Sequence, residues 1–259
     1  MITSSSNAQV KNVIQLNTKG KARSKQGLFV VEGIKMFREA PKDWISKVYI
    51  RESMYEEGSW KQELESVPHE VVADAVFRQM SDTMTPQGIL TVLRQPHYEW
   101  KDIAGGDAPL LVVLEDLQDP GNLGTILRTS EGAGVDGILL SKGCVDIFNP
   151  KTIRSTMGSI YRMPFLYLDN MTKLMEKLKE EQICTYAAHL KGKNFYDQEN
   201  YRGKTAFLIG NEGNGLSEEL SEMSECLIRI PMAGKVESLN AAMACGILTY
   251  EASRQRRNA

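Results

Sequence analysis

Short apolar runs that alternate with helical segments constrain the fold of this chain more than any other feature of its sequence. The run LLVVLED, residues 110–116, stays apolar until it ends in acids, as expected for a strand buried on both faces of a parallel sheet. A helix is predicted to follow over residues 123–133, with Asp119 and Asn122 among its start signals and Gly134 at its end. The apolar run ILLS then begins the next strand.

The alternation of strand, turn and helix continues along the rest of the chain. Strands are predicted in the runs FLYL, CTYAAHL, AFLIG and LIRIP. Helices are predicted near MTKLMEKLKEE and from about Ser238 to Arg254. This order of elements indicates a parallel α/β sheet with helices on both faces.

A smaller α/β domain is predicted ahead of this sheet, because 259 residues are enough for two domains. An amphipathic stretch at residues 33–40 predicts a helix between its first two strands. Gly105, Gly106 and Pro109 lie among polar residues, a composition typical of a linker, so we expect domains of residues 1–105 and 106–259. The strands predicted in the smaller domain are residues 28–32, 48–52, 69–74 and 89–93.

Composition argues against a membrane protein and against a metal site. Apolar residues make up 42% of the chain, yet no stretch approaches the roughly eighteen apolar residues that span a bilayer. The first residues lack the apolar core of a secretory signal, so we expect a cytoplasmic protein. The cysteines form no C-x-x-C pair and have no matching histidine spacing, which favours reduced thiols over zinc ligands. They are Cys144, Cys184, Cys226 and Cys245.

The first 38 residues are basic, although the whole chain has a formal net charge of -2. Lys19, Lys21, Arg23 and Lys25 place four positive charges within seven residues. Such a cluster is a candidate for contacts with RNA phosphates. A short charge run is also compatible with a solvated loop or helix end, and the sequence leaves both interpretations open.

Residues 132–137 match the dinucleotide-binding pattern G-x-G-x-x-G letter for letter. That pattern binds pyrophosphate only where it follows a strand and opens a helix. Here the glycines follow a predicted helix and precede a strand. We therefore expect Gly134 to end the helix rather than to hold a phosphate.

Three later segments place polar residues where predicted strands end, which is the usual ligand crevice of a parallel sheet. In the first, residues 114–134, the polar marks are Asn122 and Arg128. Local rules offer simpler roles, since Asn122 would cap the helix and Arg128 would pair with Glu131 one turn on. A spacing of six does not place the two side chains on one helix face, so periodicity cannot join them.

The second and third segments follow the strands AFLIG and LIRIP. In the second, Gly210, Gly213 and Gly215 alternate with polar residues, more glycine than a tight turn needs, and this favours a loop that a ligand approaches closely. The third runs from the loop IPMAGKVES into the last helix, which Ser238 or Asn240 would cap. Capping explains the serine but leaves the glycine and lysine of that loop unexplained.

Together, these segments resemble the three signature motifs of the SpoU/TrmH family of tRNA and rRNA 2'-O-methyltransferases, in the SPOUT superfamily. The motif stretches are NLGTILR, GNEGNGL and IPMAGKVESLN, in the family's order, and the resemblance covers most of residues 110–256. The stretches SKQGLFVVEGIKMFREA and TPQGILTVL are similar to the L30e-like substrate-recognition domain that often precedes this catalytic domain.

The resemblance implies a C-terminal trefoil knot, a homodimer with the site near the subunit interface, and S-adenosyl-L-methionine as methyl donor. Gly210, Ile230 and Leu239 would bind S-adenosyl-L-methionine, largely through backbone groups. Lys235 and Glu237 correspond to variable loop positions. The polar catalytic set would be Asn122, Arg128, Glu212, Ser238 and Asn240.

The expected activity is methylation of a ribose 2'-hydroxyl in rRNA or tRNA, with no metal. Arg128 corresponds to the family's proposed base, but a free guanidinium stays protonated at neutral pH, so a clamp on the ribose and its phosphate is the other role. Two other functions compete. A non-catalytic RNA-binding or ribosome-assembly protein would not need the intact polar set, and a nucleotide-dependent oxidoreductase would need a glycine fingerprint after its first strand.

Overall fold

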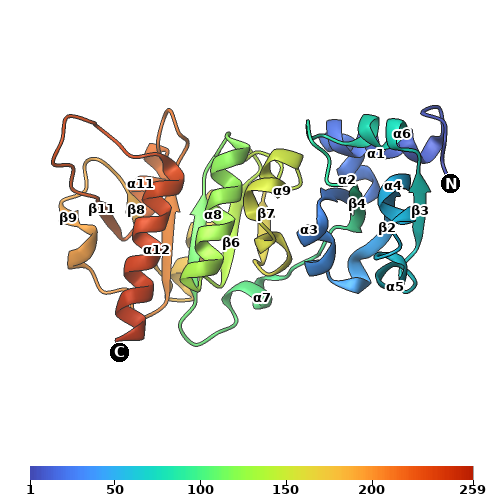
Figure 1. Cartoon of the computed structure of the whole chain (residues 1–259). Helices are drawn as coiled ribbons and strands as arrows, with labels where there is room; N and C mark the ends of the chain where they lie inside the picture. The colour runs from blue at the N-terminus through green and yellow to red at the C-terminus, as the bar shows by residue number, and fades with distance from the viewer. Residues whose placement is uncertain (259) are drawn as a thin grey trace. The chain divides into compact units, whose positions relative to one another are not determined.

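Two units are formed by residues 1–258, the part of the chain that this computed structural model describes. The first unit comprises Met1–His97 together with Asp146–Tyr161, and the second comprises Tyr98–Val145 and the chain from Arg162 onward (Figure 1). The short helix α7 (Trp100–Ala104), which lies just before the linker expected near residue 105, belongs to the second unit. That residues 146–161 join the first unit was not predicted.

The first unit is built on a four-stranded sheet in the order β1-β4-β2-β3. β2 and β3 are parallel, and the other two pairs are antiparallel. All four predicted strands are confirmed. Their bounds are β1 Leu28–Glu32, β2 Ile45–Arg51, β3 His69–Val72 and β4 Ile89–Arg94.

The helices of the first unit include two at the N-terminus that the sequence analysis did not predict. The first of these buries Val10, Val13 and Leu16, whose spacing of three is the helical signal that was missed. The second carries most of the basic cluster. The helices are α1 Ala8–Thr18, α2 Gly20–Gln26, α3 Ile34–Glu39, α4 Glu52–Glu56, α5 Lys61–Leu64, α6 Asp74–Met80 and α9 Pro150–Thr156.

Residues 146–161 complete the core of the first unit, although they lie between two strands of the second unit in the sequence. The ring of Phe148 packs against Phe29, with 4.7 Å between the ring centroids. The hydroxyl of Tyr161 donates a hydrogen bond of 2.8 Å to the carbonyl oxygen of Met36. Burial of these aromatic groups makes the segment an integral part of the unit.

The second unit contains a seven-stranded sheet in the order β7-β6-β5-β10-β8-β11-β9, and every neighbouring pair is parallel. The central strands are fully buried and almost entirely apolar, with Ser141 in β6 and Thr205 in β10 as their polar residues, which confirms the prediction from their composition. The bounds are β5 Leu110–Leu114, β6 Gly137–Ser141, β7 Phe165–Leu168, β8 Cys184–Ala188, β9 Asn194–Phe195, β10 Thr205–Ile209 and β11 Cys226–Arg229.

Helices cover both faces of this sheet. On one face α8 (Pro120–Ala133) packs against α12 (Ala241–Arg257), which also contacts β10 (Figure 1). On the other face, apolar side chains of α7, α10 (Met171–Glu180) and α11 (Glu218–Met223) pack with alternate residues of β5 and β10. The predicted α/β class is confirmed, and the trefoil knot implied by the resemblance stays a prediction.

The false dinucleotide pattern has a structural explanation. Gly134 ends α8 in the left-handed conformation, with φ of 80°, as predicted. Gly137 begins β6 where a Cβ atom would lie 2.4 Å from Ile103 of α7. These glycines therefore end a helix and permit close packing, and neither opens a helix towards a phosphate.

Parallel strands β5, β10, β8 and β11 are adjacent in the sheet, so the loops that follow them lie at one edge of it. These loops contain the three sequence motifs. Within residues 1–258, no helix combines the length and the apolar character needed to cross a membrane.

Candidate active site

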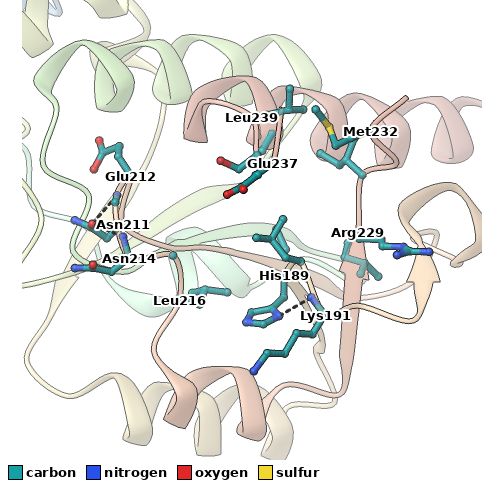
Figure 2. A pocket seen from close by; sticks show the side chains of 18 residues that line it. His189, Lys191, Asn211, Glu212, Asn214, Leu216, Arg229, Met232, Glu237 and Leu239 are labelled. Atoms are coloured by element: carbon teal, nitrogen blue, oxygen red, sulfur yellow. Dashed lines mark hydrogen bonds between the residues drawn. The ribbon is translucent and has the colours of Figure 1, made fainter. Parts of the chain in front are cut away.

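A cavity of about 430 Å³ lies at this edge of the sheet. It is lined by the loops after β8, β10 and β11 and by the segment that leads into α12. Figure 2 shows Glu237 and Leu239 on one side of the cavity and Leu216 and His189 on the other. The volume lies in the range of about 300–1,000 Å³ that is typical of small-molecule and cofactor sites.

Of the residues predicted to bind S-adenosyl-L-methionine, Ile230 and Leu239 line this cavity. Ser238, from the predicted polar set, lines it as well and is exposed. The structure thus brings the beginning and the end of the third motif to the same space.

Gly210, also predicted to bind S-adenosyl-L-methionine, shapes the loop after β10, and its contact with the methyl donor stays a prediction. It is not among the lining residues, and a Cβ atom there would lie 2.1 Å from both the carbonyl carbon of Gly215 and the nitrogen of Leu216. Backbone atoms cannot yield as a flexible side chain can. Glycine is therefore needed so that the loop after β10 can fold back on its own strand, and not because a side chain would fill the cavity.

Asn211 closes this loop. Its backbone N–H and carbonyl pair with those of Gly215 at 3.0 and 2.9 Å. Its side-chain oxygen accepts hydrogen bonds from the backbone of Gly213 and Asn214, at 2.9 and 3.1 Å (Figure 2). The next residue, Glu212, is thereby held at the rim of the cavity.

A hydrogen-bonded chain joins one residue from each of the three motifs. The side-chain amide of Asn240 donates to the side-chain oxygen of Asn122 at 2.9 Å, and the amide of Asn122 donates to Glu212 at 3.0 Å. Glu212 also accepts the backbone N–H groups of Gln118 and Asp119, at 3.0 and 2.9 Å. Residues 90 and 118 positions apart in the sequence thus meet in one polar network.

The charge of Glu212 is stabilised by these donors. Partial burial acts to raise its pKa, but the amide of Asn122 and the backbone N–H groups outweigh burial and hold the pKa below its ordinary value. The carboxylate is therefore ionised and fixed near neutral pH, as a group that orients its neighbours should be.

The helix caps decide two alternatives that the sequence left open. The side chain of Asp119 caps α8 by accepting the backbone N–H of Asn122, so the Asn122 side chain is not the cap and is free to join the network. Asn240, and not Ser238, caps α12, accepting from Ala242 at 2.9 Å and Met243 at 3.3 Å. Asn240 therefore both starts the helix and holds Asn122.

Comparison with known protein families decides what kind of protein carries this site. The model of the SpoU rRNA Methylase family matches residues 109–250, more than half of the chain. The chain belongs to the SpoU rRNA methylase family. The MRM3-like substrate binding domain matches residues 7–91, in the first unit.

Two relatives and one solved structure are similar to this SpoU methylase along nearly their whole length. The chain is 33% identical to the 23S rRNA (guanosine(2553)-2'-O)-methyltransferase RlmP of Bacillus subtilis, covering 96% of this chain and 97% of that protein. It is 35% identical to an uncharacterized tRNA/rRNA methyltransferase of Synechocystis, covering 98% and 94%. The crystal structure of an AdoMet-bound rRNA methyltransferase from Sinorhizobium meliloti matches with a TM-score of 0.84 and 32% identity, covering 98% and 97%.

In this SpoU methylase, the network includes neither Ser238, which lines the cavity, nor Arg128. Arg128 is exposed on α8, and within residues 1–258 its side chain forms no hydrogen bond or ion pair, so the surface pair with Glu131 is absent. Glu131 instead accepts a hydrogen bond of 2.7 Å from Arg162. The guanidinium of Arg128 therefore remains available to another molecule.

The basic cluster predicted to contact RNA needs one correction. Lys19, Lys21 and Lys25 are exposed, but Arg23 is only 4% exposed. Its guanidinium donates to Asp146 at 2.8 Å and to the carbonyl oxygen of Leu16 at 2.7 Å. Arg23 was wrongly predicted as a phosphate ligand, because its buried guanidinium forms a structural ion pair with Asp146 within the first unit.

Sequence reasoning missed two groups that shape this SpoU methylase site, Asn211 and the backbone N–H of Gln118. An asparagine directly after a strand and before glycines is a known turn former, and that signal would have identified Asn211. The donor of Gln118 is a backbone group and has no sequence signal.

The four thiols of this SpoU methylase are free, as predicted. Burial raises the pKa of Cys245 to about 12, so this thiol is protonated and unreactive. Within residues 1–258, no three His, Cys, Asp or Glu side chains are grouped so that they would hold a metal ion.

Proposed function

We propose that this chain transfers a methyl group from S-adenosyl-L-methionine to a ribose 2'-hydroxyl of rRNA. The observation that carries the proposal is the Asn240–Asn122–Glu212 chain at the rim of a cofactor-sized cavity, because it unites all three motifs of the family. We infer rRNA as the substrate from two relatives, because RlmP of Bacillus subtilis and RlmB of Xylella fastidiosa are named as guanosine 2'-O-methyltransferases of 23S rRNA. A tRNA is the second candidate substrate.

The cavity suits S-adenosyl-L-methionine. Apolar side chains of Ile230 and Leu239 would hold the adenosine part, and the loop shaped by Gly210 and Asn211 would supply backbone groups. When bound, S-adenosyl-L-methionine supplies an electrophilic methyl group. The protein must then hold a ribose 2'-oxygen in line with that methyl group.

The polar residues would divide the remaining work. Asn122, Glu212 and Asn240 form a fixed framework that positions the rim of the cavity. Ser238, exposed on the lining, would contact the substrate or the methyl donor. Arg128 would either accept the 2'-hydroxyl proton or clamp the ribose and its phosphate, and both roles require the unpaired guanidinium that the structure contains.

Two variants of Arg128 test its role. Arg128→Ala is expected to slow single-turnover methylation by about 100- to 10,000-fold. Similar losses in Arg128→Ala and Arg128→Lys would assign a specific guanidinium role, whereas rescue by lysine would assign a role of charge alone. Lys173→Ala, an exposed cation on α10, is the control. Wild-type rates in both Arg128 variants would remove this residue from the site.

Calorimetric titration with S-adenosyl-L-methionine tests the cofactor, with one site per subunit expected and a rise in melting temperature by mass action. Mapping of ribose methylation in total RNA, with and without the gene, then identifies the nucleotide. A non-catalytic RNA-binding or ribosome-assembly protein would leave that map unchanged. Absence of any thermal shift at saturating S-adenosyl-L-methionine would refute the proposed activity.

The first domain is proposed to recognise the RNA and residues 106–259 to perform the chemistry. The family match to a substrate-binding domain and the exposed Lys19, Lys21 and Lys25 support this division. Replacing these three lysines should weaken RNA binding and flatten its salt dependence by about 0.7 to 0.9 in log-log slope for each lost phosphate contact. Affinity for S-adenosyl-L-methionine should not change. Unchanged RNA affinity would indicate that these lysines are solvated surface residues that do not contact RNA.

A homodimer with a knotted C-terminal segment, acting in the cytoplasm, completes the proposal. Met243 and Tyr250 on α12 are 60% and 50% exposed, which is unusual for large apolar groups of one helix and suits a subunit interface. Light scattering on the purified protein tests the dimer, and a monomeric mass at micromolar concentration would refute it.

A further inference from the structure

We propose that Asp116 and Ser141 form a positioning pair that sets the geometry of the active-site network from outside the cavity. Neither residue lines the cavity or touches the Asn240–Asn122–Glu212 chain. The inference rests on the proposed methyltransferase function and deepens it, because it names residues that act on the reaction only through others.

The first observation concerns the backbone of Asp116, which lies two residues after the end of β5. Its φ is 51°, in the left-handed region that residues other than glycine, asparagine and aspartate seldom adopt. Such a conformation persists where its surroundings hold it. Here it turns the chain sharply between β5 and α8.

Ser141, at the end of the neighbouring strand β6, holds that conformation. Its hydroxyl donates a hydrogen bond of 2.6 Å to the carboxylate of Asp116 and accepts the backbone N–H of Asp116 at 2.9 Å. Ser141 is 5% exposed, so water does not replace these bonds easily. Gly143 leaves room for the carboxylate, because a Cβ atom there would lie 2.0 Å from it.

The turn held in this way presents its carbonyl oxygen to both active-site loops. The carbonyl of Asp116 accepts a hydrogen bond of 2.8 Å from the side chain of Asn211 and one of 2.9 Å from the side chain of Gln118. Asn211 closes the loop that carries Glu212, and the backbone of Gln118 donates to Glu212 directly. Both side chains that bond to this carbonyl therefore belong to residues that help to hold the Glu212 carboxylate.

The positioning pair should therefore affect the rate of methyl transfer more than the binding of S-adenosyl-L-methionine. If the turn moves, Glu212 and Asn122 lose their alignment, whereas Ile230 and Leu239 on the opposite loop keep their places. A displacement of about 1 Å in a catalytic framework costs on the order of 100-fold in rate. Affinity for S-adenosyl-L-methionine should change much less.

Three substitutions of Asp116 separate its charge, its hydrogen bond and its backbone conformation. Asp116→Asn keeps the acceptor and tolerates the left-handed backbone, and should retain activity within about threefold. Asp116→Gly keeps only the conformation and should lose about 10-fold. Asp116→Ala loses both and should lose on the order of 100-fold in kcat. The dissociation constant of S-adenosyl-L-methionine, measured by calorimetry, should stay within about threefold in all three.

Ser141→Ala tests the other half of the pair and should reduce kcat by about 10- to 100-fold. Ser221→Ala is its matched control, since Ser221 is also a buried serine of the second unit but bonds only within its own helix end. A readout independent of activity is hydrogen exchange of the backbone amides of Gln118 and Asp119, which donate to Glu212 and should lose protection in Ser141→Ala and Asp116→Ala.

The outcomes are distinguishable. Wild-type kcat in Asp116→Ala and Ser141→Ala would overturn the positioning pair and leave the proposed function intact. Equal losses in Asp116→Asn and Asp116→Ala would also overturn it, because the hydrogen bond would then not be the cause. If the wild-type protein methylates no rRNA or tRNA, the proposed function fails, while loss of protection at Gln118 and Asp119 would still show the structural coupling.

Discussion

A substitution at Gly210 offers the sharpest test of how the loop after β10 forms part of the binding site for S-adenosyl-L-methionine. In Gly210→Ala the new methyl group would lie 2.1 Å from two backbone atoms of the facing turn, where ordinary contacts begin at 3.4 Å. The turn at Gly215 and Leu216 must therefore retreat by more than about 1 Å. It cannot do so and keep the paired hydrogen bonds between Asn211 and Gly215.

The magnitude follows from the cost of overpacking, which is typically about 1–3 kcal/mol and is expected at the upper end where backbone meets backbone. A penalty of about 3 kcal/mol on the closed loop lowers the population of the binding-competent form by roughly 100-fold. The apparent dissociation constant of S-adenosyl-L-methionine for Gly210→Ala should rise by the same factor. Isothermal titration calorimetry on the purified protein measures it.

Gly203→Ala is the matched control, because Gly203 precedes β10 as Gly210 follows it. A Cβ atom on Gly203 would meet no atom within 4 Å, and its φ is not in the left-handed region. Its affinity for S-adenosyl-L-methionine should stay within about twofold of the wild type. Wild-type affinity in Gly210→Ala would refute the steric argument, and equal losses in both variants would point to backbone entropy instead.

Three further predictions concern stability, each measured by thermal or denaturant unfolding. Arg23→Ala removes one partner of the ion pair with Asp146, whose side chain is 34% exposed. The free energy of unfolding should therefore fall by an amount near the lower end of about 3–5 kcal/mol. Lys21→Ala, at an exposed position, should cost less than about 0.5 kcal/mol. Phe148→Ala should cost about 3–5 kcal/mol, and a loss below 1 kcal/mol would contradict its place in the core. Because the folded-state pKa of Glu212 is depressed, the ionised carboxylate stabilises the fold above pH 4.5, and this stabilisation is lost as pH falls further. The stability advantage of the wild type over Glu212→Gln should therefore shrink at acidic pH. An advantage independent of pH would contradict the ionised, hydrogen-bonded role of Glu212.

The sequence by itself determined the elements of the second unit. Continuous apolar runs are long enough to define buried strands, and turn chemistry at Asp119 and Gly134 marked both ends of α8. The order of three motifs also indicated the family that the comparisons then established. These are local signals, and a local signal survives without knowledge of the rest of the fold.

Local signals were weakest where polar residues dominate. α1 and α2 escaped prediction because their charged and amide residues obscure the apolar spacing. The charge of Arg23 suggested a surface residue, since charged groups are seldom buried unless they are paired. Its partner, Asp146, lies 123 residues away, and no pattern in the sequence links the two.

Only the tertiary structure decided which groups meet at the site. Asn122 lies 90 residues from Glu212 and 118 residues from Asn240, and the sequence offered helix capping as a sufficient local role for both asparagines. Adjacent parallel strands bring their loops to one edge, and this joins the three side chains in one network. The role of Asp116 is set in the same way, because a residue can hold a left-handed turn only when a neighbouring strand supplies the hydrogen bonds that stabilise it.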